Sequence, residues 1–162
     1  MMQPCKKKIG PERRLALRLA HASVPSVGVW QLSGLSGVSH QTAYSIIGKA
    51  SHSGLVDALP AIRTKWIEEA GTDEFEPWVR ALIKALPSAF LTVAGALPDN
   101  LRPAGVPGVC EKNLDTMIAL HATNPGQVEA SLIEAIEKLE SHFDKLGRLI
   151  AAQRRNTEVK AA

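Results

Sequence analysis

Apolar residues recur every three or four positions along most of this 162-residue chain, and no convincing run of them alternates at the two-residue period of a strand. Leu15, Leu19 and Ala22, for example, share one helical face in a segment that opens at Pro11, a favourable first residue of a helix. The sequence shows no internal repeat. It therefore predicts a mainly α protein.

Proline and glycine are expected to separate the helical segments. Gly54 is a favourable residue for ending one helix. Pro60 indicates a short extended piece before the next helix, and Pro87 indicates the start of a separate short helix. Residues 95–109 are rich in proline and glycine and are predicted to form a loop.

Composition is typical of a globular protein, with 45% hydrophobic and 22% charged residues. No apolar run approaches the ~18 residues that span a bilayer, and the basic N-terminus has no apolar segment behind it, so we expect neither a membrane partner nor a signal peptide. Cys5 and Cys110 fit no metal-binding spacing and indicate reduced thiols. The expected location is cytoplasmic, in a bacterium or a phage-infected host cell.

Charge divides the chain into two unequal parts. Residues 1–65 carry nine Lys and Arg against two acidic residues, which gives +7, whereas residues 66–162 carry ten basic and fourteen acidic residues, which gives −4. A basic first half favours contact with a polyanion such as nucleic acid. A coincidental distribution of surface charge is the alternative.

Residues 30–56 contain the ordered features that two short helices joined by a tight turn require. Leu32 and Leu35 can pack inward from the first helix. Gly37 permits a sharp turn, and Ser39 is a favourable N-cap for a second helix over about 40–53. The side chains expected to bury one face of that second helix are Ala43, Ile46, Ile47 and Ala50. The arrangement predicts a helix-turn-helix.

The residues left on the other side of the second helix are mostly short and polar. They are Ser39, His40, Gln41, Thr42, Tyr44 and Ser45, with Lys49 at the flank. Gln can make two hydrogen bonds to adenine, Ser can pair with several base edges, and Tyr and Ser hydroxyls can reach phosphates. These seven side chains are the candidate DNA contacts. A compact helical hairpin without a nucleic-acid role is the alternative.

The stretch "QLSGLSGVSHQTAYSIIGKASHSGLV" resembles the winged helix-turn-helix of bacterial regulators, including the MarR-like group, over residues 30–56. The matching residues are Leu32, Leu35, Gly37, Val38, Ser39, Thr42, Ile46, Gly54, Leu55 and Val56. The resemblance implies a DNA-facing role for Ser39, His40, Gln41, Tyr44, Ser45 and Lys49. Two departures stand out: Ala50 replaces a large aliphatic residue, and no basic β-hairpin is evident after "GLV". We expect a wing that is shortened or replaced by a helix.

The N-terminal segment carries further basic residues. Lys6, Lys7 and Lys8 precede Arg13 and Arg14, and together they could form an arm that contacts phosphates. A tail that only increases solubility explains the three lysines equally well.

Asn124 and Pro125 are a typical cap and first residue for a long terminal helix that should run to about Arg155. This helix carries apolar residues at alternating steps of four and three, as in a coiled coil: Leu132, Ile136, Leu139, Phe143, Leu146 and Ile150. We expect this seam to form a homodimer, because a regulator on paired half-sites acts as a symmetric dimer. Packing within one chain is the alternative.

Catalytic readings have little support. The five histidines show no HExxH or similar metal-ligand spacing, and no histidine and acid accompany Cys110 as a nucleophile would require. The segment "GVPGVCEK" lacks the GK[ST] ending of a phosphate-binding loop. We therefore expect no enzyme activity, no metal and no cofactor.

The sequence as a whole predicts two parts. Residues 1–70 would form a helix-turn-helix DNA-binding domain with a basic arm, and residues 71–162 a helical region for dimerisation or a protein partner, with the loop 95–109. The expected function is sequence-specific binding of double-stranded DNA as a transcriptional regulator, in particular a repressor. An all-helical adaptor that binds a protein partner, and a DNA binder in plasmid or phage segregation or replication control, are the alternatives.

Overall fold

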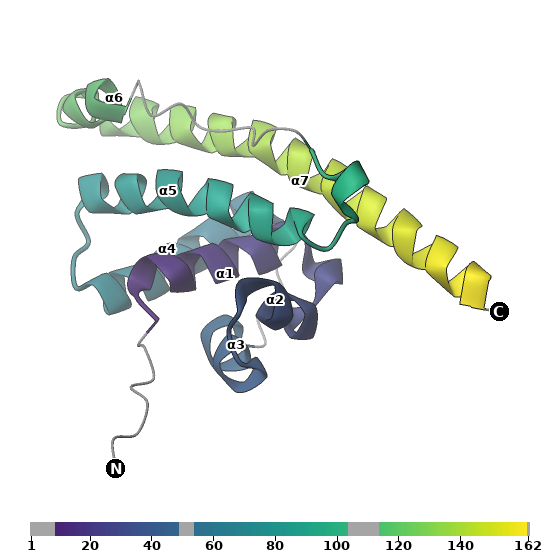
Figure 1. The fold of residues 1–162 in the computed structure, drawn as a ribbon. Helices are drawn as coiled ribbons and strands as arrows, with labels where there is room; N and C mark the ends of the chain where they lie inside the picture. Colours follow the sequence, from purple (N-terminus) through teal and green to yellow (C-terminus); the bar gives the residue numbers. More distant parts are fainter. Residues whose placement is uncertain (1–8, 49–53, 104–113, 162) are drawn as a thin grey trace, which may run out of the picture.

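The computed structural model describes residues 9–48, 54–103 and 114–161, and within these ranges the chain is mainly helical and contains no strand. The predicted mainly α class is thereby confirmed. The elements in chain order (Figure 1) are α1 (Pro11–Ser23), η1 (Pro25–Val27), α2 (Val29–Ser36), α3 (His40–Ile47), α4 (Leu55–Ala70), α5 (Phe75–Ala94), η2 (Asp99–Leu101), α6 (Leu114–His121) and α7 (Pro125–Ala161).

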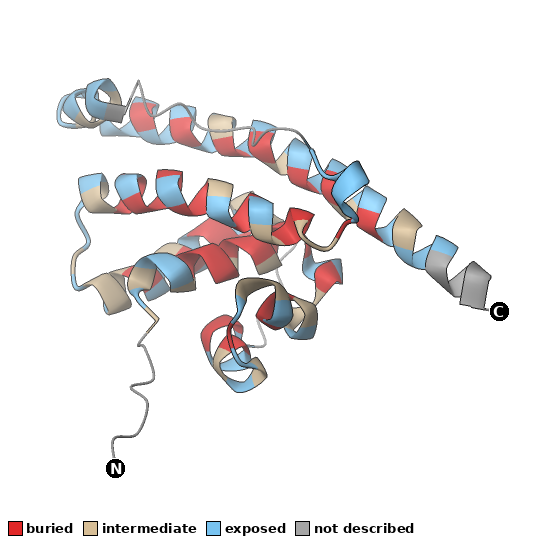
Figure 2. Ribbon diagram, in the orientation of Figure 1, coloured by how far each residue is buried: buried red, intermediate tan, exposed pale blue. Residues whose placement is uncertain are grey.

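Helices α1, α4 and α5 pack against one another, and α7 contacts all three. Figure 1 shows α7 along one side of this group, with α2 and α3 beyond α1 on the other side. The buried residues lie on the sides of the helices that face one another (Figure 2). One hydrophobic cluster includes residues from α1 to α5 and from α7. The proposed boundary near residue 70 therefore follows the change in charge and not a break in the core, and it stays a prediction.

Helix α4 begins at Leu55 and continues through Pro60, so the prediction of an extended piece before the helix was wrong. A proline inside a helix costs about 3 kcal/mol, because its ring clashes with the preceding turn and removes one hydrogen bond. Leu59, Ile62 and Trp66 are all buried at helical spacing, and burial of each such side chain stabilises the fold by roughly 1.5–3 kcal/mol. Burial of one face outweighs the cost of Pro60. Where the resemblance placed a β-wing, the described residues after Gly54 form this helix.

Helix α5 likewise continues through Pro87, and the two short helices expected on either side of that proline are one helix of 20 residues. Leu86 and Phe90, on either side of Pro87, are 1% and 3% exposed. The ring of Phe90 meets the ring of Phe143 on α7 edge to face, with 5.2 Å between centroids. The apolar face is thus continuous across the proline.

The seam of α7 is buried within the single chain. All six of its residues are at most 5% exposed and belong to the hydrophobic cluster: Leu132, Ile136, Leu139, Phe143, Leu146 and Ile150. These residues pack within the single chain, as in the alternative given for this seam, and the expected homodimer stays a prediction. No described helix, α7 included, is both long enough and apolar enough to cross a membrane.

Polar contacts fix α7 and α6 to the rest of the molecule. Glu140 on α7 accepts a hydrogen bond from the backbone N–H of Val56 (3.4 Å), and so helps to cap the first turn of α4. On the short helix α6, Asp115 accepts from Arg80 of α5 (3.0 Å). The hydrogen bond that the Arg80 guanidinium donates to Glu76 is the main cause of a raised pKa of Arg80, and the hydrogen bond to Asp115 is the second cause.

Candidate nucleic-acid interface

The turn between α2 and α3 is built from three consecutive residues. Gly37 has a left-handed backbone (φ +72°), which glycine adopts without strain. Val38 is 8% exposed, and its N–H donates to the carbonyl of Ser33 (3.0 Å). Ser39 Oγ accepts from the N–H of Thr42 (3.2 Å) and donates to the Thr42 hydroxyl (2.8 Å). The predicted turn and N-cap are both present, and they fix the direction in which α3 leaves α2.

Helix α3 has one buried and one exposed face, as the spacing of its residues predicts. Ala43, Ile46 and Ile47 are at most 7% exposed, whereas Gln41, Tyr44 and Ser45 are exposed, with Tyr44 at 53%. The helix ends at Ile47, where Gly48 takes a positive φ (+68°), and not at residue 53 as expected. Lys49 and Ala50 lie outside the described residues.

The side chain of His40 is engaged by α2, and its expected contact with DNA stays a prediction. Its Nδ1 lies 2.6 Å from Ser33 Oγ, and its ring stacks on Trp30 with 3.3 Å between centroids and 8° between planes. Trp30 remains 66% exposed. Trp30 was not among the predicted contacts, because its position relative to His40 depends on the turn between α2 and α3.

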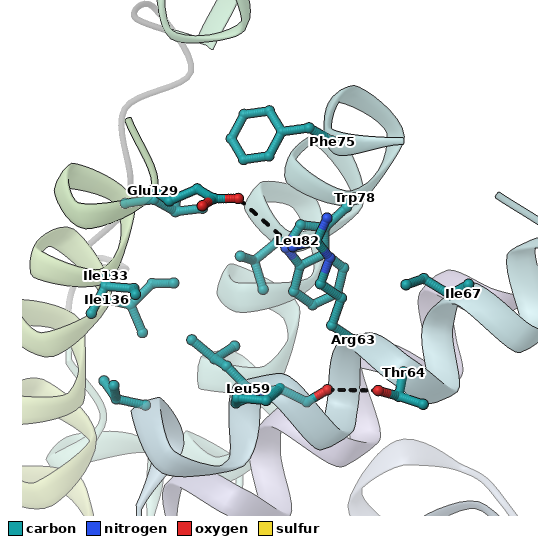
Figure 3. Close-up of a pocket in the computed structure, with 13 residues that line it drawn as sticks. Leu59, Arg63, Thr64, Ile67, Phe75, Trp78, Leu82, Glu129, Ile133 and Ile136 are labelled. Carbon is teal, nitrogen blue, oxygen red and sulfur yellow. Dashed lines mark hydrogen bonds and ion pairs between the residues drawn. The ribbon is translucent and has the colours of Figure 1, made fainter. Parts of the chain in front are cut away.

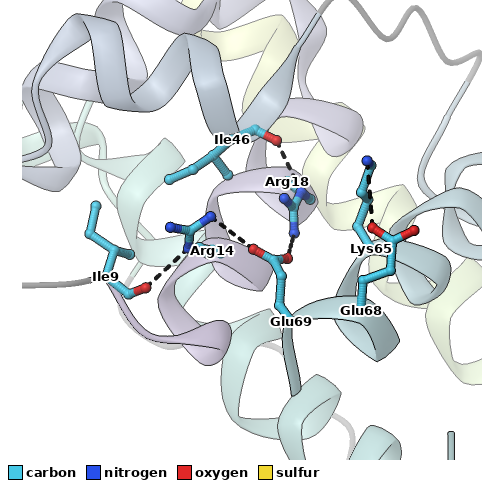
Figure 4. Close-up of polar contacts among 7 residues, drawn as sticks. All are labelled: Ile9, Arg14, Arg18, Ile46, Lys65, Glu68 and Glu69. Carbon is cyan, nitrogen blue, oxygen red and sulfur yellow. Dashed lines mark hydrogen bonds and ion pairs between the residues drawn. The ribbon is translucent and has the colours of Figure 1, made fainter. Parts of the chain in front are cut away.

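Arg14, expected on phosphates, is engaged within the chain. It donates to the carbonyl of Ile9 (3.0 Å) and pairs with Glu69 of α4 (3.0 Å). Arg18, one turn further along α1, also pairs with Glu69 and donates through Nε to the carbonyl of Ile46 (3.0 Å). Figure 4 shows the two guanidinium groups converging on the one carboxylate. Glu69 therefore links α4 to α1, and Arg18 extends the link to the last turn of α3.

Arg13 is the described cation closest to the turn. Its guanidinium donates to the carbonyl of Ser36 (2.6 Å), at the C-terminal end of α2, while the residue stays exposed. One of its nitrogens lies 3.8 Å from the position that a Cβ on Gly37 would occupy. Among the described residues Arg13 donates to a carbonyl and forms no ion pair, so its charge is available to a phosphate. Lys6, Lys7 and Lys8 lie outside the described residues.

The candidate contacts among the described residues are Gln41, Tyr44 and Ser45 on α3, Trp30 on α2 and Arg13 beside the turn. This set can donate and accept hydrogen bonds at base edges and bring one positive charge to a phosphate. The described residues hold no group of three or more His, Cys, Asp or Glu side chains that could bind a metal ion.

No family model, curated protein or solved structure matches this chain.

Proposed function

We propose that the chain binds double-stranded DNA through α3, in the major groove, as a transcriptional regulator that represses. The observation that carries the proposal is the outer face of α3. This face carries exposed, uncharged polar side chains, while the opposite face is buried and a capped turn fixes the start of the helix.

The dimensions of α3 suit a groove. With its side chains an α-helix is about 10–12 Å across, which is about the width of the B-DNA major groove, and the eight residues of α3 extend for about 12 Å along its axis. Gln41 is the side chain best suited to a specific base, because its amide can bind the N6 and N7 edge of adenine with two hydrogen bonds. Ser45 and the Tyr44 hydroxyl can serve as second base contacts or as phosphate contacts.

Affinity for the DNA backbone has to come from outside α3. The described helix carries no Lys or Arg, so Arg13 beside the turn is the first phosphate contact in the proposal, and the sequence adds Lys6, Lys7, Lys8 and Lys49. Thr42 and Ser39 support the first turn, because their hydroxyls bond to each other.

A homodimer on two half-sites belongs to the proposal, through a surface other than the buried seam. Outside the seam, α7 offers Leu149, an apolar residue that is 44% exposed. If a single copy of the chain binds DNA instead, the proposed contacts of α3 with the bases are the same.

A second candidate function, an adaptor that binds a protein, is favoured by two exposed aromatic residues on the same surface. Trp30 and Tyr44 are 66% and 53% exposed, and aromatic side chains are enriched at protein interfaces.

The test is a selection from a pool of randomised DNA duplexes at two salt concentrations. Wild-type protein should enrich a defined sequence, and its affinity should fall steeply as salt rises, because phosphate contacts release counterions. Gln41→Ala with Tyr44→Ala should abolish the enrichment. Ser141→Ala with His142→Ala changes two exposed residues of α7 and should leave it intact.

Failure to bind DNA at low salt, with the protein folded, would exclude the regulator and favour the adaptor. Enrichment that survives the α3 double substitution would exclude α3 as the reading element.

A further inference from the structure

A cavity of about 490 Å³ lies between α4, α5 and α7. Its wall is mainly apolar and includes Leu59 and Ile67 of α4, Trp78 and Leu82 of α5, and Ile133 and Ile136 of α7 (Figure 3). Cavities of roughly 300–1,000 Å³ with mostly apolar walls and a few polar groups are typical binding sites for small molecules. None of the residues proposed for DNA binding lines this cavity.

Two charged side chains stand on the wall. Arg63 rises from α4 toward Trp78 and Glu129 (Figure 3), with its guanidinium carbon 5.9 Å from the centre of the Trp78 ring. Its contact with Glu129 is long, 4.0 Å between the nearest nitrogen and oxygen. The same Glu129 oxygen lies 3.6 Å from Nε2 of His121, and the Glu129 side chain is 47% exposed.

Arg63 has a donor that is buried and unused. Its Nε has no hydrogen-bond partner among the described residues. A buried donor without a partner costs about 1–3 kcal/mol, more if charged. The Arg63 side chain as a whole is 33% exposed, so a small turn of its guanidinium toward the cavity would bring this donor to a ligand acceptor and recover that cost. Glu129 needs no such ligand, because it is half exposed and lies between two nitrogen-bearing side chains.

We propose that this cavity binds a small apolar molecule that carries one carboxylate, with the carboxylate on Arg63 and the apolar part against Trp78 and the aliphatic wall. A carboxylate can accept from Nε and a terminal nitrogen of a guanidinium in parallel, which is the geometry that arginine favours. The ring of Trp78 holds the guanidinium at the wall. An amine would instead have to approach Glu129, beside the positive charge of Arg63.

The probes are octanoate, octan-1-ol and octylamine, which share one chain and differ in the charge of the head group. Binding to the full chain without DNA is measured by calorimetry. We expect octanoate to bind best. Arg63→Gln should weaken octanoate about tenfold, from the loss of charge-assisted hydrogen bonds, and should leave octanol unchanged. Lys84→Gln removes an exposed charge from α5 and should change neither.

Ile133→Trp provides a second variant, because Ile133 lines the cavity and is 41% exposed, so the larger ring can fill the space with little strain. It should weaken octanoate and octanol alike. Equal binding of all three probes, a preference for octylamine, or octanoate binding that is insensitive to both variants would each overturn the proposal. The result does not depend on DNA binding, so the two proposals fail separately.

Discussion

Trp30 and His40 lie face to face, with 8° between their ring planes, and so join the second residue of α2 to the first residue of α3. Ser33 adds a hydrogen bond to the same histidine from the next turn of α2. The two helices of the candidate DNA interface are thus fixed by side chains as well as by the turn at Gly37.

The stack should appear as a coupling energy in a double-mutant cycle of Trp30→Ala and His40→Ala. We expect about 1 kcal/mol of coupling, because stacked rings contribute roughly 0.5–1.5 kcal/mol beyond the area they bury. Urea unfolding of the four proteins measures it. The control is a cycle of Trp30→Ala with Lys84→Ala, which changes an exposed residue of α5 and should be additive. Additivity in both cycles would show that the stack contributes nothing.

The N-cap of α3 should be a local determinant of stability. Ser39→Ala removes the acceptor for the Thr42 N–H and should lower the free energy of unfolding by about 1 kcal/mol. Ser39→Asp should restore most of it, since aspartate is an equally good cap. Ser45→Ala, on the exposed face of the same helix, should change stability by less than about 0.5 kcal/mol. Thermal or urea unfolding ranks the three variants, and an equal loss for Ser39→Ala and Ser45→Ala contradicts the role of the cap.

Glu69 and Glu68 form a matched pair for testing the link between α1, α3 and α4. Glu69→Gln leaves the Arg18 side chain, which is 10% exposed, without its carboxylate, and should cost about 2 kcal/mol as a buried charge loses a charged hydrogen-bond partner. Glu68→Gln breaks only an exposed pair with Lys65, which is worth less than about 1 kcal/mol.

Chemical denaturation distinguishes these two glutamate variants. If both variants lost the same free energy of unfolding, water would replace Glu69 on the two arginines at no cost. The link from α4 to the end of α3 would then not be rigid.

The seam of α7 can be tested through Phe143 and Leu149. Phe143→Ala empties a fully buried position and should cost about 3–5 kcal/mol through lost burial and the cavity left behind. Leu149→Ala, at a position that is 44% exposed, should cost far less. The unfolding midpoint of Leu149→Ala is compared with that of Phe143→Ala by calorimetry. If Phe143→Ala instead weakened dimerisation and left the stability of the monomer unchanged, Phe143 would belong to a subunit interface.

Short-range rules predicted much of the candidate site. The cap at Ser39 and the buried face of Ala43, Ile46 and Ile47 depend only on residues within one or two turns, where spacing determines burial. The end of α3 was placed too late, because Gly54 was chosen as the stop. Gly48, with its positive φ, ends the helix first.

Long-range contacts explain what the sequence could not predict. Arg14, which was expected on phosphates, pairs with Glu69, and this partner lies 55 residues further along the chain. Pro60 and Pro87 were given too much weight as helix breakers, because local propensity yields to the burial of a continuous apolar face. The cavity that includes Arg63 and Glu129 depends on three helices meeting in space, and no local pattern signals it.

The contacts of α7 bear on the order in which the molecule can form during synthesis. Arg154 donates to the carbonyls of Ser26 and Val27, which precede it by 128 and 127 residues. At a translation rate of about 5–20 residues per second, the 37 residues of α7 take roughly 2–7 s to emerge. Until then the apolar sides of α1, α4 and α5 that α7 covers stay open to water. A nascent chain paused before α7 should therefore be a chaperone substrate, and the completed chain should not.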